Sequence, residues 1–239
     1  IAARASDVER DVVDGVVGAP ATRPETIAEA KGVRHLLLPA LHAIQGRLGW
    51  ISPGALGYAC ERLGVPPAEG YGVATFYALF ALKERPPTVV HVCDDIACKA
   101  AGAETICDEL TGEVGEAGTR RGNATWLRSP CLGMCEQAPA AMVIAAGAQP
   151  FERAWGHASA RQVVAALDTG RIDEPRSVPI PQRGDPSLRL LRRVGTVDAT
   201  SLDDYRAHGG YAALRRAIEL GAAGVIREVT DAKLLGRGG

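Results

Sequence analysis

Residues 89–98 read VVHVCDDIAC, so a short apolar run leads directly into two cysteines. Residues 125–135 read TWLRSPCLGMC, so the run 125–130 precedes a second cysteine pair. The first run has the length and composition of a buried strand. The sequence therefore predicts that Cys93 lies at the end of a strand and that both cysteine pairs lie in loops. The pairs lie 32 residues apart and comprise Cys93 and Cys98, then Cys131 and Cys135.

Four cysteines in two close pairs have several possible uses. Disulfides are disfavoured because residues 1–17 lack the long apolar region of a secretory signal, and thiols in the cytosol stay reduced. Structural zinc usually takes C-x2-C knuckles or a histidine half-site, and neither is present. Four unrelated core thiols are the remaining alternative. An iron–sulfur cluster fits best, most simply [2Fe–2S], which takes four thiolates.

The surrounding residues refine this prediction. Gly133 gives the second loop a backbone freedom that other residues lack. Three acids, Asp94, Asp95 and Glu136, would lower the cluster potential, or they are simply solvated loop residues. His91 is not expected to bind iron, because a Rieske-type site needs two histidines and only this one is near in sequence.

The other chemically reactive side chains are expected to be structural. Cys60 and Cys107 each stand in a helical stretch without a partner cysteine at ligand spacing. His42 is interpreted as a structural histidine on a helix. Tyr71, Phe76, Tyr77 and Phe80 are interpreted as core or subunit interface. No catalytic residue is predicted, since no Ser–His–Asp order, H-E-x-x-H or Walker loop occurs.

Several motifs carry a family resemblance over about residues 30–170. They are 38–45 (LPALHAIQ), 64–77 (GVPPAEGYGVATFY) and 131–140 (CLGMCEQAPA). The chain resembles the thioredoxin-like ferredoxin subunit of the NADH-oxidising module of respiratory complex I, which also occurs in NAD-linked hydrogenases and formate dehydrogenases. The resemblance implies a [2Fe–2S] cluster on the four paired cysteines. Asp94 and Asp95 depart from the small residues common in the family and resemble the fused β subunits of some formate dehydrogenases.

A second resemblance follows a proline-rich stretch at 174–187, which is interpreted as an extended linker. Residues 190–195 (LLRRVG) and 201–211 (SLDDYRAHGGY) resemble the beginning of the flavoprotein subunit that binds FMN and NADH in the same enzymes. The resemblance implies that Arg237, Gly238 and Gly239 form the edge of a flavin and nucleotide site. The alternative is a basic, glycine-rich tail.

Local signals predict the remaining elements. Apolar spacing predicts a helix over 33–48, with a kink or a new start at Pro39. Ser52 and Pro53 predict a helix start, Gly64 its end, and 66–69 (PPAE) another start. After residue 88 the expected order is strand, loop, helix, strand, loop, strand, helix, with loop at 94–97. The final helix is expected at 160–168, and residues 1–28 are either helical or a disordered arm.

Together these signals predict an α/β chain with an N-terminal helical bundle, a thioredoxin-like [2Fe–2S] domain, a linker and the start of a flavoprotein domain. The expected parts are an arm at 1–28, helices at 29–85, the ferredoxin domain at 86–172, the linker at 173–189 and the incomplete flavoprotein domain at 190–239.

The predicted function is electron transfer within a cytoplasmic NADH-linked oxidoreductase. The cluster would exchange single electrons with FMN, which handles the two-electron hydride of NAD(H). The favoured host is an NAD-dependent formate dehydrogenase, followed by complex I or an NAD-linked hydrogenase. Expected partners are the flavoprotein portion and an iron–sulfur or molybdenum-type catalytic subunit. A free-standing ferredoxin carrier or redox sensor is the alternative.

Composition is consistent with such a partner subunit. The formal net charge is −1, which gives no reason to expect nucleic acid or membrane binding. No apolar stretch reaches the ~18 residues that a transmembrane helix needs.

Overall fold

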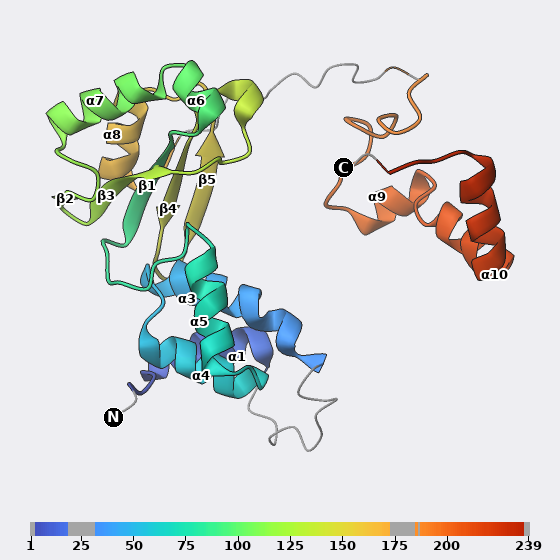
Figure 1. Ribbon diagram of the computed structural model, residues 1–239, viewed down its shortest axis with the longest axis horizontal. Coiled ribbons are helices and arrows are strands. Elements are labelled where there is room, and N and C mark those ends of the chain that lie inside the picture. The colour runs from blue at the N-terminus through green and yellow to red at the C-terminus, as the bar shows by residue number, and fades with distance from the viewer. Residues whose placement is uncertain (1–2, 19–31, 173–184, 186, 237–239) are drawn as a thin grey trace. The chain divides into compact units, whose positions relative to one another are not determined.

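A computed structural model describes residues 3–18, 32–172, 185 and 187–236. The chain forms two compact units, Ile1–Pro175 and Arg176–Gly239. Figure 1 shows the elements of each unit, which are described separately below.

The first unit begins with a bundle of helices. Ser6 and Glu9 form a reciprocal capping box at the start of its first helix. Ser52 caps another helix, which begins at Pro53 and ends at Gly64 in the left-handed conformation, as predicted from the sequence. The elements are α1 (Asp7–Val17), the 3-10 turn η1 (Arg34–Leu36), α3 (Leu37–Leu48), α4 (Pro53–Leu63) and α5 (Pro67–Phe76).

Two expectations for this bundle are resolved. Pro39 lies in the first turn of α3, so it marks a new helix start after η1, and a proline is tolerated there because its missing N–H has no intrahelical partner. The N-terminal segment is helical over Asp7–Val17 and packs on α3 and α4, with Val13 fully buried in their core. It is therefore part of the bundle and not a disordered arm, while 19–28 lie outside the described residues.

The rest of the first unit is built on a five-stranded sheet in the order β2-β3-β1-β4-β5. β1 pairs in parallel with β3, and the other neighbouring pairs are antiparallel. The strands are β1 (Thr88–Cys93), β2 (Arg120–Arg121), β3 (Ala124–Ser129), β4 (Ala141–Ala145) and β5 (Phe151–Trp155). The helices are α6 (Ile96–Ala100), α7 (Ala103–Glu113) and α8 (Ala160–Thr169), with the 3-10 turn η2 (Cys135–Gln137).

This order contains two strands and one α-helix that the sequence did not predict: β2, β5 and α6. The expected loop at 94–97 is wrong for its second half, because Ile96 and Ala97 begin α6. Asp95 caps that helix with its side chain, so the segment between the first two cysteines is half loop and half helix.

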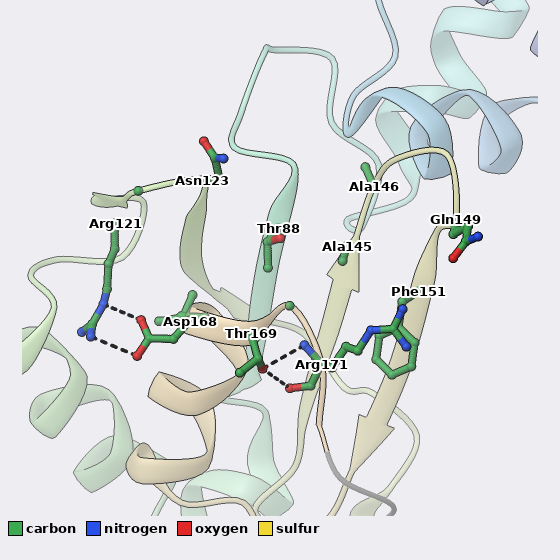
Figure 2. A pocket seen from close by; sticks show the side chains of 13 residues that line it. Thr88, Arg121, Asn123, Ala145, Ala146, Gln149, Phe151, Asp168, Thr169 and Arg171 are labelled. Atoms are coloured by element: carbon green, nitrogen blue, oxygen red, sulfur yellow. Dashed lines mark hydrogen bonds and ion pairs between the residues drawn. The ribbon is translucent and has the colours of Figure 1, made fainter.

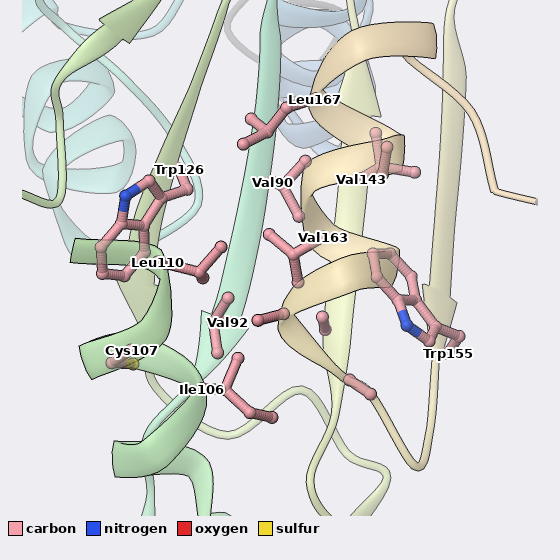
Figure 3. Packing of buried hydrophobic residues seen from close by; sticks show 14 of the residues in the cluster. Val90, Val92, Ile106, Cys107, Leu110, Trp126, Val143, Trp155, Val163 and Leu167 are labelled. Carbon is pink, nitrogen blue, oxygen red and sulfur yellow. The ribbon is translucent and has the colours of Figure 1, made fainter. Parts of the chain in front are cut away.

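One face of the sheet packs against α7 and α8 (Figure 3). Side chains alternate along a strand, so Val90 and Val92 of β1 enter this core while Val89 and His91 lie on the opposite face. Trp126, Trp155, Leu110 and Val163 are almost fully buried in the same core. This packing fixes the strand ends from which the cysteine loops begin.

The second unit contains α9 (Leu202–Ala207) and α10 (Ala212–Asp231). α10 bends at Gly221, and none of its residues is buried. The expected flavin-site residues Arg237, Gly238 and Gly239 lie outside the described residues, as does most of the expected linker. In the described part of the chain, no helix is both long and apolar enough to cross a membrane.

Candidate iron–sulfur site

The topology of the sheet brings the two cysteine loops together. β1 and β3 are parallel neighbours, so their carboxyl ends meet at one edge of the sheet. Cys93, the last residue of β1, pairs with Ser129, the last residue of β3. Cys131 follows Ser129 by two residues. The two cysteine pairs, 32 residues apart in sequence, therefore lie at the ends of neighbouring strands.

All four paired cysteines line one cavity of about 300 Å³. Cys93 and Cys98 are buried, whereas Cys131 and Cys135 are exposed. The Sγ atoms of Cys131 and Cys135 are 3.4 Å apart. Cys93 and Cys98 are close enough for a hydrogen bond between their thiols. The thiols therefore form two pairs on one cavity, with one pair inside and the other facing solvent.

The donor chemistry of this arrangement fits a two-iron cluster. Cys131 and Cys135 form one pair of thiols, and Cys93 and Cys98 form the other. A structural zinc site draws four ligands to one point at about 2.3 Å from the metal. A [2Fe–2S] cluster instead takes four thiolates distributed over two irons. The residues present thus fit that cluster, with Cys93, Cys98, Cys131 and Cys135 able to hold it.

Backbone N–H groups point at the sulfurs. Gly133 N–H donates to Cys131 Sγ at 3.4 Å, from a φ of 77° that other residues rarely adopt. The backbone of Ala140 hydrogen-bonds Cys98. Hydrogen bonds to sulfur favour the thiolate and are one of the factors that set a cluster potential.

Burial and neighbouring thiols raise the pKa of two of these cysteines. Burial, the neighbouring Cys93 and the charge of Cys135 together raise the pKa of Cys98 to about 11, against a hydrogen bond from the Ala140 backbone, which lowers it. The hydrogen bond and charge of Cys131 raise the pKa of Cys135. At neutral pH these thiols are protonated when no metal neutralises them. Metal binding must therefore release protons here, since only the thiolate is a ligand.

The second cysteine loop is braced against neighbouring segments by main-chain hydrogen bonds. Cys93 N–H donates to Ala140 O at 3.0 Å. His157 N–H donates to Gln137 O at 2.7 Å, and Ala158 N–H donates to Pro139 O at 2.8 Å. These bonds tie the loop both to β1 and to the segment that follows β5.

Gly156 lies at the centre of this brace. A Cβ added there would lie 2.3 Å from Gln137 Cβ and 2.8 Å from Gln137 O. Only a glycine allows the two segments to approach so closely. Sequence reasoning missed Gly156, because a lone glycine after an unpredicted strand carries no signal of what it touches.

The acids expected near the cluster have different surroundings. Asp94 pairs with Arg128 at 3.2 Å, and Arg128 also pairs with Glu104 at 2.9 Å. Asp95 accepts hydrogen bonds from the N–H groups of Ile96 and Cys131. Glu136 is exposed to solvent. Only part of the expected negative charge is thus free to act on a cluster, because Arg128 offsets that of Asp94.

The residues expected to be structural lie away from the cavity. Cys60 is buried in the helical bundle, and Cys107 is buried in the core between the sheet and the helices α7 and α8. His91 is also buried, and its Nε2 has no hydrogen-bond partner among the described residues. Burial lowers the pKa of His91 to about 4, with a further contribution from Arg85, so the ring is neutral at neutral pH.

Most of the aromatic residues in and just after α5 lie on the surface. Tyr71, Phe76 and Tyr77 are all exposed, so the core alternative for these three residues is wrong. Phe80 is partly buried and makes an edge contact with His42, whose ring lies on the bundle surface. Phe76 and Tyr77 border an apolar cavity of about 620 Å³ with an Arg34–Glu69 ion pair at its edge.

A further cavity of about 480 Å³ lies at the end of the sheet opposite the cysteines (Figure 2). It is bordered by Thr88 at the start of β1 and by the end of α8. Its charged groups already have partners: Arg121 pairs with Asp168 at 3.0 Å, and Arg171 lies over the ring of Phe151. The chemistry of four converging thiols is absent from this part of the described structure.

The mixed sheet, the helices on its face and the cavity at the carboxyl ends of β1 and β3 define a thioredoxin-like α/β domain with four thiols that could hold an iron–sulfur cluster. Residues 24–167 match the family model described as thioredoxin-like [2Fe-2S] ferredoxin. The match spans more than half of the chain, and the chain belongs to this family.

Several similar proteins are named as subunits of NADH-quinone oxidoreductase. The chain is 31% identical to NADH-quinone oxidoreductase subunit 2 of Thermus thermophilus, with 65% of this chain and 87% of the relative covered. It is 30% identical to an NADH-quinone oxidoreductase subunit of Mycobacterium bovis, with 72% and 70% covered. An NADH-quinone oxidoreductase subunit of Pseudomonas aeruginosa is 34% identical, with 44% and 66% covered.

A solved NAD+-reducing [NiFe]-hydrogenase is also similar. Its sequence identity is 22% and its TM-score is 0.40, with 63% of this chain and 24% of the hydrogenase chain covered.

Proposed function

We propose that this chain is an electron-transfer subunit of an NADH-linked oxidoreductase and that Cys93, Cys98, Cys131 and Cys135 hold its [2Fe–2S] cluster. The observation that carries the proposal is the single cavity lined by all four thiols. The family match and the names of the relatives support the same assignment. When bound, the cluster would accept and release one electron at a time.

The residues of the chain contribute position and electrostatics. Cys93 and Cys98 are buried against the sheet and so give the site a rigid inner side. Cys131 and Cys135 face solvent, which leaves the outer side open to a redox partner. The N–H groups of Gly133 and Ala140 stabilise thiolate charge.

The redox partner in this proposal is an FMN held by a flavoprotein portion that begins near Leu190. This assignment of the partner is supported by the sequence resemblance of residues 190–211. The family match does not bear on it, since that match ends at residue 167. Residues Arg237, Gly238 and Gly239 would form the edge of that flavin site. The flavin exchanges a hydride with NAD(H), and the cluster exchanges single electrons with the flavin.

The host enzyme completes the proposal. The acidic pair Asp94-Asp95 and the fused flavoprotein start favour an NAD-dependent formate dehydrogenase in the cytoplasm, together with an iron–sulfur or molybdenum-type catalytic subunit. The names of the relatives favour complex I. A free-standing ferredoxin would lack any co-purifying flavoprotein.

Anaerobic purification followed by iron and sulfide analysis tests the cluster, with about two of each expected per chain. Stoichiometric zinc without iron would contradict the proposal. For the electron-transfer role, Cys131→Ser is expected to damage the cluster while NADH oxidation persists with an artificial acceptor that draws electrons from the flavin. Equal loss of the cluster and of NADH oxidation with the artificial acceptor would contradict the proposed order of electron transfer, from flavin to cluster.

A further inference from the structure

Asp95 makes a side-chain contact between the two cysteine loops. It lies between Cys93 and Cys98, outside the hydrogen-bonded part of β1. Its Oδ1 accepts from the N–H of Ile96 at 2.7 Å, which caps α6. Its Oδ2 accepts from the N–H of Cys131 at 3.2 Å, across 36 positions of sequence. One carboxylate therefore holds both the helix that carries Cys98 and the backbone of a cysteine from the other pair.

The other bonds between the loops lie nearer the sheet. Asp94 N–H donates to Ser129 O at 3.1 Å, and Cys93 N–H donates to Ala140 O at 3.0 Å. These main-chain bonds hold the bases of the loops. Cys131 itself is exposed and lies outside any helix or strand, so its position depends on fewer constraints.

We propose that Asp95 is a positioning residue of the iron–sulfur site, whose carboxylate ties the loop of the first cysteine pair to Cys131 of the second. The inference rests on the proposed cluster function. A preformed tether lowers the cost of ordering the exposed loop when the metal binds, because less chain freedom remains to be lost.

The two oxygens of Asp95 allow capping to be separated from tethering. Asparagine caps helices about as well as aspartate does. It has only one side-chain oxygen, however, and its NH2 group cannot accept from the N–H of Cys131. Asp95→Asn should therefore keep the cap of α6 and lose the tether, whereas Asp95→Ala loses both.

The test compares full-length wild-type protein with Asp95→Asn, Asp95→Ala and the control Asp94→Asn. The control removes an equal charge from the adjacent residue, whose carboxylate pairs with Arg128 and does not reach Cys131. Each protein receives its cluster anaerobically, and bleaching of the visible absorption by an excess of iron chelator is followed. Visible circular dichroism reports the geometry of the bound cluster.

Both Asp95 variants are expected to lose the cluster about tenfold faster than wild type, a factor that corresponds to about 1.4 kcal/mol. Their visible circular dichroism should change as well. Asp94→Asn should resemble wild type in both measurements. If Asp95→Asn matches wild type and only Asp95→Ala is impaired, Asp95 is a helix cap alone and the proposal is overturned. Equal rates for all four proteins overturn it as well.

Hydrogen exchange of the metal-free proteins provides a measurement that does not depend on the cluster. The amide of Cys131 should exchange faster in Asp95→Asn than in wild type and Asp94→Asn. Unchanged exchange at Cys131 refutes the tether even where a variant fails to retain iron. A wild-type protein that never binds iron and sulfide would instead overturn the proposed function, while the exchange measurement still decides the role of Asp95.

Discussion

Gly156→Ala is expected to disable the iron–sulfur site without altering any proposed ligand. The added Cβ would lie 2.3 Å from Gln137 Cβ, whereas ordinary contacts begin at 3.4 Å. Relief of this clash requires a displacement of about 1 Å, and overpacking of this kind typically costs about 1–3 kcal/mol. The backbone oxygen of Gln137 is only 2.8 Å away, so rotation of the glutamine side chain cannot remove the whole clash.

The cysteine loop should move in preference to the core. Trp155, the residue before Gly156, is almost fully buried, whereas Cys135 and Glu136 of the η2 turn are exposed. A shift of about 1 Å at Cys135 is large, because metal–ligand distances tolerate only about 0.2 Å. The substitution should therefore lower the iron content strongly and the free energy of unfolding moderately.

The assay measures iron per chain, the visible spectrum and chemical unfolding for wild type, Gly156→Ala and the control Gly112→Ala. Gly112 lies in α7 with nothing within 4 Å of its added Cβ. The control should keep its iron and gain about 0.5–1 kcal/mol, because alanine favours a helix over glycine. Adding Gln137→Gly to Gly156→Ala should restore part of the iron. A Gly156→Ala protein with full iron content and unchanged stability would refute the reasoning.

Two further predictions concern the helical bundle. Gly70→Ala places a Cβ 2.3 Å from Cys60 Sγ and should lower the free energy of unfolding by about 1–3 kcal/mol. The double variant with Cys60→Ala should be more stable than the sum of the two single effects predicts. Strict additivity in chemical unfolding would count against this contact. Burial alone would raise the pKa of Glu9, but hydrogen bonds from Ser52 and Ser6 hold this pKa below its ordinary value of 4.5. Glu9→Gln should therefore destabilise the protein at pH values above 4.5, where the carboxylate is charged. The difference should vanish as pH falls through the lowered pKa, because protonated Glu9 no longer carries the charge that those bonds stabilise; a constant difference from neutral to acid pH would contradict the assignment.

Much of the fold could be predicted from local chemistry. Ser52, Pro53 and Gly64 delimit α4, since a cap, a first-turn proline and a left-handed glycine are determined by neighbouring residues alone. β1 was predictable because four of its six residues are apolar and it follows two prolines. These signals require no knowledge of the tertiary structure.

The missed elements lack such signals or contain competing ones. β5 reads FERAW, with two charged residues among five, because it is an edge strand with one neighbour. β2 has only two residues and is defined by its pairing with β3. α6 was not predicted although Asp95 is a good capping residue, because a helix of five residues is too short to show an apolar periodicity.

The candidate site likewise has a part that local sequence predicts and a part that depends on the tertiary structure. The four thiols could be selected from their spacing, but their convergence depends on β1 and β3 being parallel neighbours. The same pairing places Cys131 within reach of Asp95 and Arg128 within reach of Asp94. Contacts across 34 or more positions of sequence depend on strand order, which no local pattern encodes. The close approach at Gly156 is hidden for the same reason.

The unequal burial of the two cysteine pairs connects the fold with the proposed electron transfer. Cys93 ends a central strand and Cys98 lies in a helix capped by Asp95, so both positions are set by regular structure. Cys131 and Cys135 occupy an exposed loop that main-chain bonds and one carboxylate hold in place. In the proposed electron transfer, a redox partner would approach from that exposed side, where Ile96 is 84% exposed beside the cavity. On this proposal the rigid inner pair would anchor the site, and the exact placement of the outer loop would control both cluster retention and access for the partner.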